Sequence, residues 1–197
     1  KIKKEKPLPP ISDDEKPFEL PQGWEWCRFE DVVDIQSGIT KGRSLSGREL
    51  TTVKYLAVAN VQRGYLQLDG LKEIELPVDE LEKYRVINND LLITEGGDWD
   101  KVGRTAIWRD EIPYVAHQNH VFKARVYIEA QSETWLEIYL NSPFAREYFA
   151  GSSKQTTNLA SINKTQLRGC LIAVPMLREK EQIVKRLQQL WGGCDRL

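Results

Sequence analysis

Three polar segments of the chain contain the residue types that proteins use to recognise DNA: 38–44 (GITKGRS), 95–104 (EGGDWDKVGR) and 152–158 (SSKQTTN). Arg and Lys bind phosphates or guanine, Asn and Gln can form two hydrogen bonds with adenine, and Ser and Thr can bind either partner. Glycine allows a phosphate to approach the backbone closely. The candidate DNA-binding residues are Lys41, Arg43, Gly97, Asp98, Lys101, Arg104, Lys154, Gln155, Thr156, Thr157 and Asn158.

The third segment belongs to a long stretch without negative charge. No Asp or Glu occurs between Glu147 and Glu179, although the chain has 29 acidic residues. A surface that faces phosphates favours such a composition, because carboxylates and phosphates repel each other. We therefore expect Lys154 to bind phosphate, and Gln155 to Asn158 to contact base edges or to position the DNA backbone. An ordinary solvated loop with a chance shortage of acid would have the same composition.

The second segment mixes basic and acidic residues. Lys101 and Arg104 are expected to contact phosphate, and the two glycines before them would allow a close approach. Asp98 and Asp100 count mildly against a purely phosphate-binding role, although a carboxylate can accept a hydrogen bond from cytosine N4. Trp99 is expected to anchor this loop in the core, with stacking near DNA as the alternative.

The sequence lacks the motifs of common enzymes. It contains neither of the nucleotide-binding motifs G-x-G-x-x-G and G-x-x-x-x-G-K-[ST], and no N-P-P-Y or D-P-P-Y motif of adenine methyltransferases. The Glu-x-Lys pattern of metal-dependent nucleases is absent, and the one Asp-x-Lys, Asp14 to Lys16, lies in a Pro-rich segment. His117 and His120 are the only histidines, and on an expected strand they point to opposite faces, which makes a poor metal pair. We therefore expect a non-catalytic binding module with no catalytic residue, metal or cofactor in this chain.

Composition indicates the setting of the protein. The net charge is −1, so a nucleic-acid partner has to be met by a local basic patch. No apolar run approaches the ~18 residues of a membrane span, and the N-terminus does not resemble a signal peptide. Cys27, Cys170 and Cys194 lie far apart, which favours reduced thiols over a disulfide framework. We expect a cytoplasmic protein without a membrane partner.

The elements that must hold the three segments are strands and short helices. Apolar alternation and β-branched residues predict strands at 24–29, 53–61, 65–68, 71–76, 90–94, 105–108, 113–128 and 170–174. Helices are expected at 30–35 (one turn), from Pro77, at 133–141 after the N-cap Ser132, at 143–150 after the N-cap Ser142, and as one turn after Asn163. Gly151 is expected to end the helix before it, and Gln166 completes a capping box with Asn163.

The two ends of the chain differ from the rest. Residues 1–22 are charged and Pro-rich without an apolar period, so we interpret them as a solvated linker, with a basic tail that touches DNA as the alternative. In the last segment apolar residues alternate at spacings of four and three, the heptad pattern that forms a seam with a partner helix. The seam residues are Ile183, Leu187, Leu190, Cys194 and Leu197. We expect this helix to continue in a longer protein, although Gly192-Gly193 weakens it by about 1 kcal/mol per glycine.

Taken together, these segments resemble the target-recognition domain of the specificity (S) subunit of type I restriction-modification systems. The residues that carry the resemblance lie at 20–42, 55–66, 90–108, 117–125, 139–149, 152–175 and 179–187, which is nearly the whole chain. The resemblance rests on the ordered set rather than on one motif. Two features depart from the family pattern: Pro175 stands alone in VPMLREKEQ where a PLPPL-like turn is common, and Gly192-Gly193 interrupts the helix.

The resemblance implies a globular α+β (mixed) domain with a twisted, largely antiparallel β-sheet and flanking short helices, followed by the start of a long conserved helix. The implied organisation is an N-terminal arm at 1–22, a target-recognition domain at 23–177 and the start of a coiled-coil-type helix at 178–197. Each S subunit of the family carries two such domains, each binds one half of a bipartite DNA site, and paired helices set the spacing. Because base-contacting residues vary with the target, the candidate residues above rest on loop chemistry alone.

The implied partners are double-stranded DNA, the methylase (M) and restriction (R) subunits, and the second half of the same subunit through paired helices. S-adenosylmethionine, ATP and Mg are expected in the partner subunits, in a bacterial or archaeal cytoplasm, and this chain is expected to perform no catalysis. The Pro-rich leader and the C-terminal helix favour the first of the two recognition domains. Two alternatives stay open: the recognition domain of a fused type II restriction-methylation enzyme, and a protein-interaction module that acts through the C-terminal helix.

Overall fold

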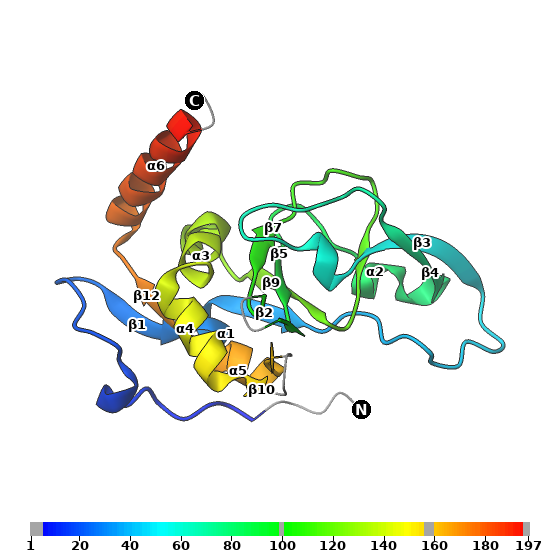
Figure 1. The fold of residues 1–197 in the computed structure, drawn as a ribbon, viewed down its shortest axis with the longest axis horizontal. Coiled ribbons are helices and arrows are strands. Elements are labelled where there is room, and N and C mark those ends of the chain that lie inside the picture. Colours follow the sequence, from blue (N-terminus) through cyan, green and yellow to red (C-terminus); the bar gives the residue numbers. More distant parts are fainter. Residues whose placement is uncertain (1–5, 99–100, 156–159, 195–197) are drawn as a thin grey trace.

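The computed structural model describes residues 6–98, 101–155 and 160–194, with the backbone alone at 154–155 and 192–194. A four-stranded antiparallel sheet lies at the centre (Figure 1), in the order β2 (Val33–Gln36), β9 (Val121–Val126), β5 (Leu91–Thr94) and β7 (Thr105–Ile107). Successive residues of β5 point to opposite faces, and all of them are buried because both faces are covered. Leu91 and Ile93 belong to the larger core, whereas Leu92 faces a second core under the loops around Val61.

Three smaller sheets surround the central one. β1 (Glu25–Arg28) pairs with β12 (Leu171–Val174), which brings the two ends of the domain together. β3 (Leu50–Leu56) pairs antiparallel with β4 (Lys72–Pro77) and parallel with the short β8 (Ala116–His117). β11 (Ala160–Ser161) lies between β10 (Lys154–Gln155) and β6 (Gly96–Gly97). The expected mixed and largely antiparallel fold is confirmed, although the strands of the described residues form four sheets rather than one.

The helices are α1 (Phe29–Val32), α2 (Leu81–Tyr84), α3 (Glu133–Leu140), α4 (Pro143–Ser152), α5 (Lys164–Gly169) and α6 (Leu177–Cys194). The helices α1, α3, α4 and α5 lie on one side of the central sheet, and the β3–β4 hairpin lies on the other side together with α2 (Figure 1). Single 3-10 turns are η1 (Asp13–Glu15), η2 (Val58–Asn60), η3 (Val78–Glu80) and η4 (Glu129–Gln131). None of the helices in the described part of the chain has the length and apolar composition that crossing a membrane requires.

The expected helix caps are confirmed. Ser132 Oγ accepts a hydrogen bond from the Trp135 N–H at 3.2 Å, and Ser142 caps α4 in the same way. Asn163 and Gln166 bond each other's backbone N–H groups through their side chains, at 2.9 and 2.7 Å. These bonds satisfy N–H groups that have no partner inside the helix, which is why the signals are local and readable in the sequence.

Several expected boundaries are wrong because long-range pairing decides them. The second half of the helical turn expected at 30–35 is strand β2, which pairs with β9. The strand expected at 53–61 runs from Leu50 to Leu56, and of 65–68 only Leu66 forms a bridge, to Val61. The strand expected at 113–128 is broken by a turn at 118–120 into β8 and β9, and α4 continues through Gly151 to Ser152.

The N-terminal arm is packed against the domain, which corrects its interpretation as a solvated linker. The Arg28 side chain is only 8% exposed, and its guanidinium donates to the Pro9 carbonyl at 3.0 and 3.1 Å and to the Glu15 carboxylate at 3.1 Å. The Arg168 guanidinium donates to the Lys6 carbonyl at 2.9 Å. Two largely buried guanidiniums thus have part of their acceptors on the arm, beside Glu30 and the Gly169 carbonyl of the domain, and these bonds attach the arm to the domain.

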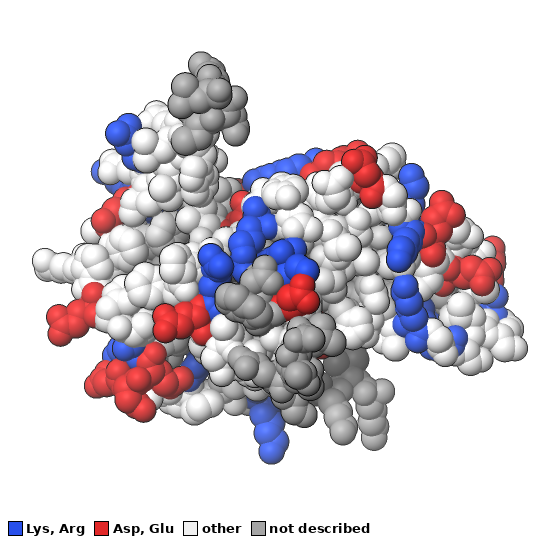
Figure 2. Space-filling view, viewed as in Figure 1, with Lys and Arg blue, Asp and Glu red and all other residues white. Residues whose placement is uncertain are grey.

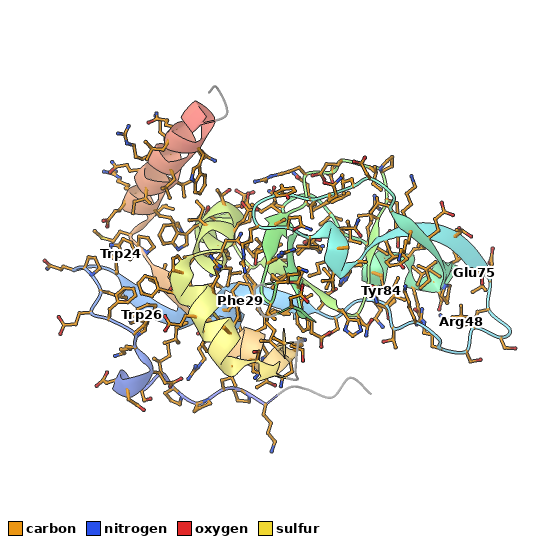
Figure 3. The ribbon with its side chains drawn as sticks, viewed as in Figure 1. Trp24, Trp26, Phe29, Arg48, Glu75 and Tyr84 are labelled. Atoms are coloured by element: carbon orange, nitrogen blue, oxygen red, sulfur yellow. The ribbon has the colours of Figure 1, made fainter. Side chains whose placement is uncertain are left out.

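The C-terminal helix α6 is attached to the domain through its first half. Ile183 packs against the larger core, and the Trp24 indole N–H donates to Glu179 Oε2 at 2.8 Å; Figure 3 shows Trp24 near the lower end of α6. Leu187 is half-buried, whereas the Leu190 side chain is 51% exposed. The expected seam is therefore divided between the domain and the solvent; the Cys194 side chain and Leu197 lie outside what the structure describes.

Candidate nucleic-acid interface

Several strand ends of the central sheet converge on one side. β5 ends at Thr94 opposite Val121, where β9 begins, and β7 begins at Thr105 opposite Ile93. Because these neighbours are antiparallel, the loop that leaves β5, the turn that precedes β9 and the loop that enters β7 lie at the same end of the sheet. We call this end the rim, and its described parts are 38–39, 95–98, 101–104, 118–120, 154–155 and 160–161.

Backbone hydrogen bonds join the first and second polar segments through the turn at 118–120. The Ile39 N–H donates to the His117 carbonyl at 2.8 Å, and the Asn119 N–H donates to the Ile39 carbonyl at 3.0 Å. On the other side of the turn, the Glu95 N–H donates to the His120 carbonyl at 2.9 Å. The turn therefore lies between the two segments and fixes their relative position.

The small β10–β11–β6 sheet brings the second and third polar segments together. Gly97 lies opposite Ala160, Gly96 lies opposite Ser161, and β11 pairs in turn with Lys154–Gln155. A Cβ on Gly96 would lie 3.0 Å from the Ala160 carbonyl oxygen, so this close pairing favours glycine. Composition predicted both segments as loops, and the strand pairing that places them side by side was not predicted.

The second segment is held in place by buried neighbours. The Thr94 hydroxyl donates to the Lys101 carbonyl at 2.6 Å and accepts from the Arg104 N–H at 2.9 Å. Gly103 has a φ of +70° and no room for a side chain, because a Cβ would lie 2.2 Å from an atom of the Phe149 ring. The loop that carries Lys101 and Arg104 is therefore anchored on both sides.

Charged side chains of this loop have protein partners. The Lys101 ammonium pairs with the Asp98 carboxylate, and both side chains are partly exposed. Arg104 Nη1 donates to Gln62 Oε1 at 2.7 Å. An exposed ion pair contributes little to stability, so replacing Asp98 by a phosphate as the partner of Lys101 costs little. The expected candidates Gly97, Asp98, Lys101 and Arg104 thus lie together at the rim.

The turn at 118–120 was not among the candidates predicted from loop chemistry. Gln118 and Asn119 are half-buried, and their side-chain amides form no hydrogen bond with any residue that the structure describes. His120 is exposed, and its Nδ1 lies 2.6 Å from Glu95 Oε2. Amides without an internal partner are suited to bind base edges. The adjacent amides in HQNH are a sequence signal for this turn, but the surrounding apolar alternation predicts a continuous strand.

His117, on the inner side of the turn, is buried in the domain and does not face the outside of the rim. Its side chain is fully buried, and Nδ1 lies 2.7 Å from the Val121 carbonyl oxygen. Burial lowers the pKa of His117 to about 4. His117 and His120 therefore do point apart, although a turn rather than a strand separates them. Within the described residues, no group of three or more His, Cys, Asp or Glu side chains could hold a metal ion.

Arg43 lies away from the rim, at the β3–β4 end of the molecule. It pairs with Glu80 at 2.5 Å, and Arg48 binds Asp79 at 2.6 Å and Glu80 at 2.7 Å. These guanidiniums, Arg43 first, lower the pKa of the Glu80 carboxyl to about 2. Figure 3 shows Arg48 and Tyr84 at the β3–β4 end of the molecule. Arg43 therefore lies apart from the other described candidates, and its contact with phosphate stays a prediction.

The remaining candidates are described only in part. Lys41 is exposed, but its Nζ donates to the Tyr55 hydroxyl at 2.5 Å and lies over the Tyr55 ring. Lys154 and Gln155 have a described backbone in β10, without their side chains. The candidates Thr156, Thr157 and Asn158, and also Trp99, lie outside the described residues, so their contacts stay predictions.

Charge is unevenly distributed over the surface. On the face of the molecule shown in Figure 2, Lys and Arg side chains gather near the middle, between α3 and the central sheet. Acidic side chains gather over η1 of the arm. At the β3–β4 end, basic and acidic side chains alternate, in agreement with the ion pairs of Arg43 and Arg48. A chain with a net charge of −1 thus presents a local basic patch.

Sequence comparisons assign most of the chain to one kind of protein. A family model described as "Type I restriction modification DNA specificity domain" matches residues 21–197. The chain is 31% identical over 206 residues to the type I restriction enzyme EcoAI specificity subunit of Escherichia coli, and 28% identical over 203 residues to the EcoEI specificity subunit of the same species. Both alignments include 100% of this chain but only 33% and 34% of those proteins, so the chain spans about a third of their length.

Solved structures show the same fold. A chain from a study described as "Structural basis underlying complex assembly and conformational transition of the type I R-M system" superposes with a TM-score of 0.63 at 20% identity, over 90% of this chain and 40% of that chain. The HsdS subunit from Thermoanaerobacter tengcongensis superposes with a TM-score of 0.59 at 19% identity, over 90% of this chain and 39% of its own. At these identities the likeness concerns the fold alone.

Proposed function

The chain belongs to the family of type I restriction-modification DNA specificity domains, and on that premise we propose that it recognises one half of a bipartite DNA target through the rim. The observation that carries the proposal is the convergence of two polar segments and the turn at 118–120 on one end of the central sheet. These parts bring ammonium, guanidinium, amide and backbone N–H groups onto one anchored surface. Contacts to phosphates and to base edges require that combination.

The side chains of the rim suit different contacts. Lys101 and Arg104 would neutralise phosphates, because each carries a positive charge on the anchored second segment. Gln118 and Asn119 would contact base edges, since their amides have no hydrogen-bond partner among the described residues. His120, which contacts Glu95, would bind DNA between the phosphate contacts and the base-edge contacts.

We propose that the longer protein acts with partner subunits rather than alone. The methylase and restriction subunits would supply S-adenosylmethionine, ATP and Mg, and this chain would direct them to the target without catalysis of its own, in a bacterial or archaeal cytoplasm. A partner helix from the same subunit would cover the second half of α6, where Leu190 and Trp191 are both more than half exposed. No match reported above is to a fused type II enzyme.

The experiment maps methylated motifs in cells that carry the intact system, with single substitutions in the full specificity subunit. Gln118→Ala or Asn119→Ala should relax the motif at one position and weaken binding by about 5- to 150-fold, because a lost bidentate base contact costs about 1–3 kcal/mol. Asn88→Ala is the matched control, since Asn88 is an exposed amide before the opposite end of β5. An unchanged motif with unchanged affinity in both variants would remove the turn from base recognition.

A second substitution tests the phosphate contacts. Lys101→Ala should weaken binding to motif and non-motif duplexes about equally and should lower the slope of log K on log salt by about one. Titrations at several salt concentrations measure that slope. If neither the turn variants nor Lys101→Ala changes DNA binding, the rim is not the DNA surface, and a protein-interaction module that acts through α6 becomes the better interpretation.

A further inference from the structure

A tight turn at 62–65 lies beside the rim and carries an exposed aromatic side chain. The turn closes with the Gln62 N–H donating to the Tyr65 carbonyl at 3.0 Å, and Gly64 adopts a φ of +78°. The Tyr65 side chain is 59% exposed. Among the described residues its ring has no aromatic or cationic partner and its hydroxyl has no hydrogen bond. The packing of the domain therefore does not account for Tyr65.

The turn is fixed to the start of β7, next to the second polar segment. The Gly64 N–H donates to the Thr105 carbonyl at 2.9 Å, and Arg104 Nη1 donates to Gln62 Oε1 at 2.7 Å. Arg63 Nη1 lies 3.3 Å from Asn141 Oδ1, and that oxygen also accepts from the Thr105 N–H at 3.2 Å. Because β7 is the outer strand of the central sheet, the turn extends the rim on that side.

This arrangement places an exposed ring in the same turn as Arg63, and the turn is bonded to Arg104 through Gln62. Stacking of a base on an aromatic ring contributes about 1–3 kcal/mol by alanine substitution, and rings placed at a base step can act as wedges. Guanidiniums beside such a ring bind the flanking phosphates.

We propose that Tyr65 is a DNA-stacking residue, whose ring packs at a base step on the flank of the recognised half-site while Arg63 and Arg104 bind the phosphates around it. The inference rests on the proposed function and adds a contact outside the three polar segments. The ring supplies affinity, and it supplies sequence preference through the ease with which the flanking step unstacks. No charge on Tyr65 takes part, so the contact is distinct from the phosphate contacts of the rim.

The test uses the full specificity subunit assembled with its methylase subunits, and a duplex that contains the motif mapped in cells. Tyr65→Ala should weaken binding about 5- to 150-fold without changing the salt slope, and Tyr65→Phe should bind like the natural protein. Tyr127→Ala is the matched control: Tyr127 is also 59% exposed, but it follows the other end of β9. A 2-aminopurine at the flanking step should brighten on binding, and Tyr65→Ala should abolish the increase.

Each outcome decides between the proposals. Unchanged affinity of Tyr65→Ala, with Lys101→Ala still weakening binding, overturns the stacking role and leaves the proposed function intact. Unchanged affinity in both variants overturns both. A loss in Tyr65→Phe as large as in Tyr65→Ala assigns the effect to the hydroxyl and also overturns the stacking role. Thermal unfolding controls for damage to the fold, which we do not expect at a side chain this exposed.

Discussion

His117 and Lys123 are cationic residue types placed inside the domain beneath the turn at 118–120. The His117 Nδ1–H donates to the Val121 carbonyl at 2.7 Å, and the Lys123 ammonium donates to the Arg85 carbonyl at 2.7 Å. Burial lowers the pKa of both side chains, because a buried cation loses its hydration. The folded state therefore favours a neutral His117, and the inner side of the rim depends on that protonation state.

We predict that His117 makes the fold sensitive to mild acid. Its pKa is about 4 in the folded chain against 6.5 for an unperturbed histidine. Above pH 6.5 the contribution of His117 to the unfolding free energy is fully present. It falls as the pH drops from 6.5 towards 4, because the unfolded state takes up the proton first. Below pH 4 the contribution no longer changes. The difference corresponds to about 3 kcal/mol. Urea unfolding at a series of pH values across this window measures it.

Two variants separate His117 from the carboxylates that titrate nearby. His117→Gln should flatten the pH dependence of the unfolding free energy, whereas His120→Gln should leave it steep, because the buried His117 is still present in that variant. Carboxylates other than Glu95, which lies 2.6 Å from His120 Nδ1, keep their partners in both variants, so a difference in slope reports the buried imidazole rather than those carboxylates. The same slope in the two variants would show that His117 is not the responsible group.

At the scale of elements, the exit of β2 is locked to the β8–β9 turn through Gly38. A Cβ on Gly38 would lie 2.2 Å from the His117 carbonyl oxygen and 2.4 Å from that of Gln118. Because these are backbone atoms, they cannot yield as the end of a flexible side chain can. We predict that Gly38→Ala pushes the first polar segment away from the turn and lowers the unfolding free energy by about 1–3 kcal/mol, as measured by urea denaturation.

Gly151→Ala provides the matched comparison. A Cβ on Gly151 meets nothing within 4 Å, and the residue lies in the last turn of α4. Alanine is the better helix former by up to about 1 kcal/mol, so this variant should be as stable as the natural chain or more stable. Similar losses in the two variants would mean that the close contact at Gly38 does not control stability.

Elements that depend on local signals were predictable, and elements that depend on distant partners were not. Ser132 and Asn163 bond backbone groups three residues away, so each cap is readable in one short stretch. β6, β10 and β11 are two-residue strands that exist because they pair with one another across the fold. No periodicity can appear in two residues, so the sequence predicts them only as loops.

The N-terminal arm was misinterpreted for the same physical reason. Its composition is that of a solvated linker, but the acceptors that it offers are backbone carbonyls, which every sequence has. The donors are distant: Arg28 lies 19 residues from Pro9, and Arg168 lies 162 residues from Lys6. The structure shows these contacts at two largely buried guanidiniums, where Arg28 also pairs with Glu15 of the arm and Arg168 also pairs with Glu30 of α1.

Across the whole molecule, the sequence predicts which residue types form the candidate site, but it does not predict where the fold places them. Residue types pointed to Lys101, Arg104 and Arg43 alike, since each is a cation near glycines. The fold separates them: the first two lie at the rim, whereas Arg43 is neutralised by Glu80. The turn at 118–120 was missed because its apolar flanks, β8 and β9, read as one strand. A net charge of −1 also conceals the separation of an acidic cluster at η1 from a basic patch (Figure 2).

α6 divides its apolar residues between the domain and the outside. Ile183 and Val184 join the larger core, and the ammonium of Lys180 donates to the Ala130 carbonyl. Further along the helix, Leu190 and Trp191 are more than half exposed. The heptad spacing alone cannot show this division, because it gives Ile183 and Leu190 equivalent positions.

The division of α6 predicts different effects of alanine substitutions at Ile183 and Leu190. Ile183→Ala should lower the unfolding free energy by about 1–2 kcal/mol, because it removes half-buried side-chain atoms from the core, whereas Leu190→Ala should change it by less than about 0.5 kcal/mol. In the full subunit the loss from Leu190→Ala should be larger, because a partner helix of the same subunit would then cover Leu190. Urea denaturation of this domain and of the full subunit measures the two effects. Equal stability losses of the two variants in the domain alone would contradict the division and restore a single continuous seam along α6.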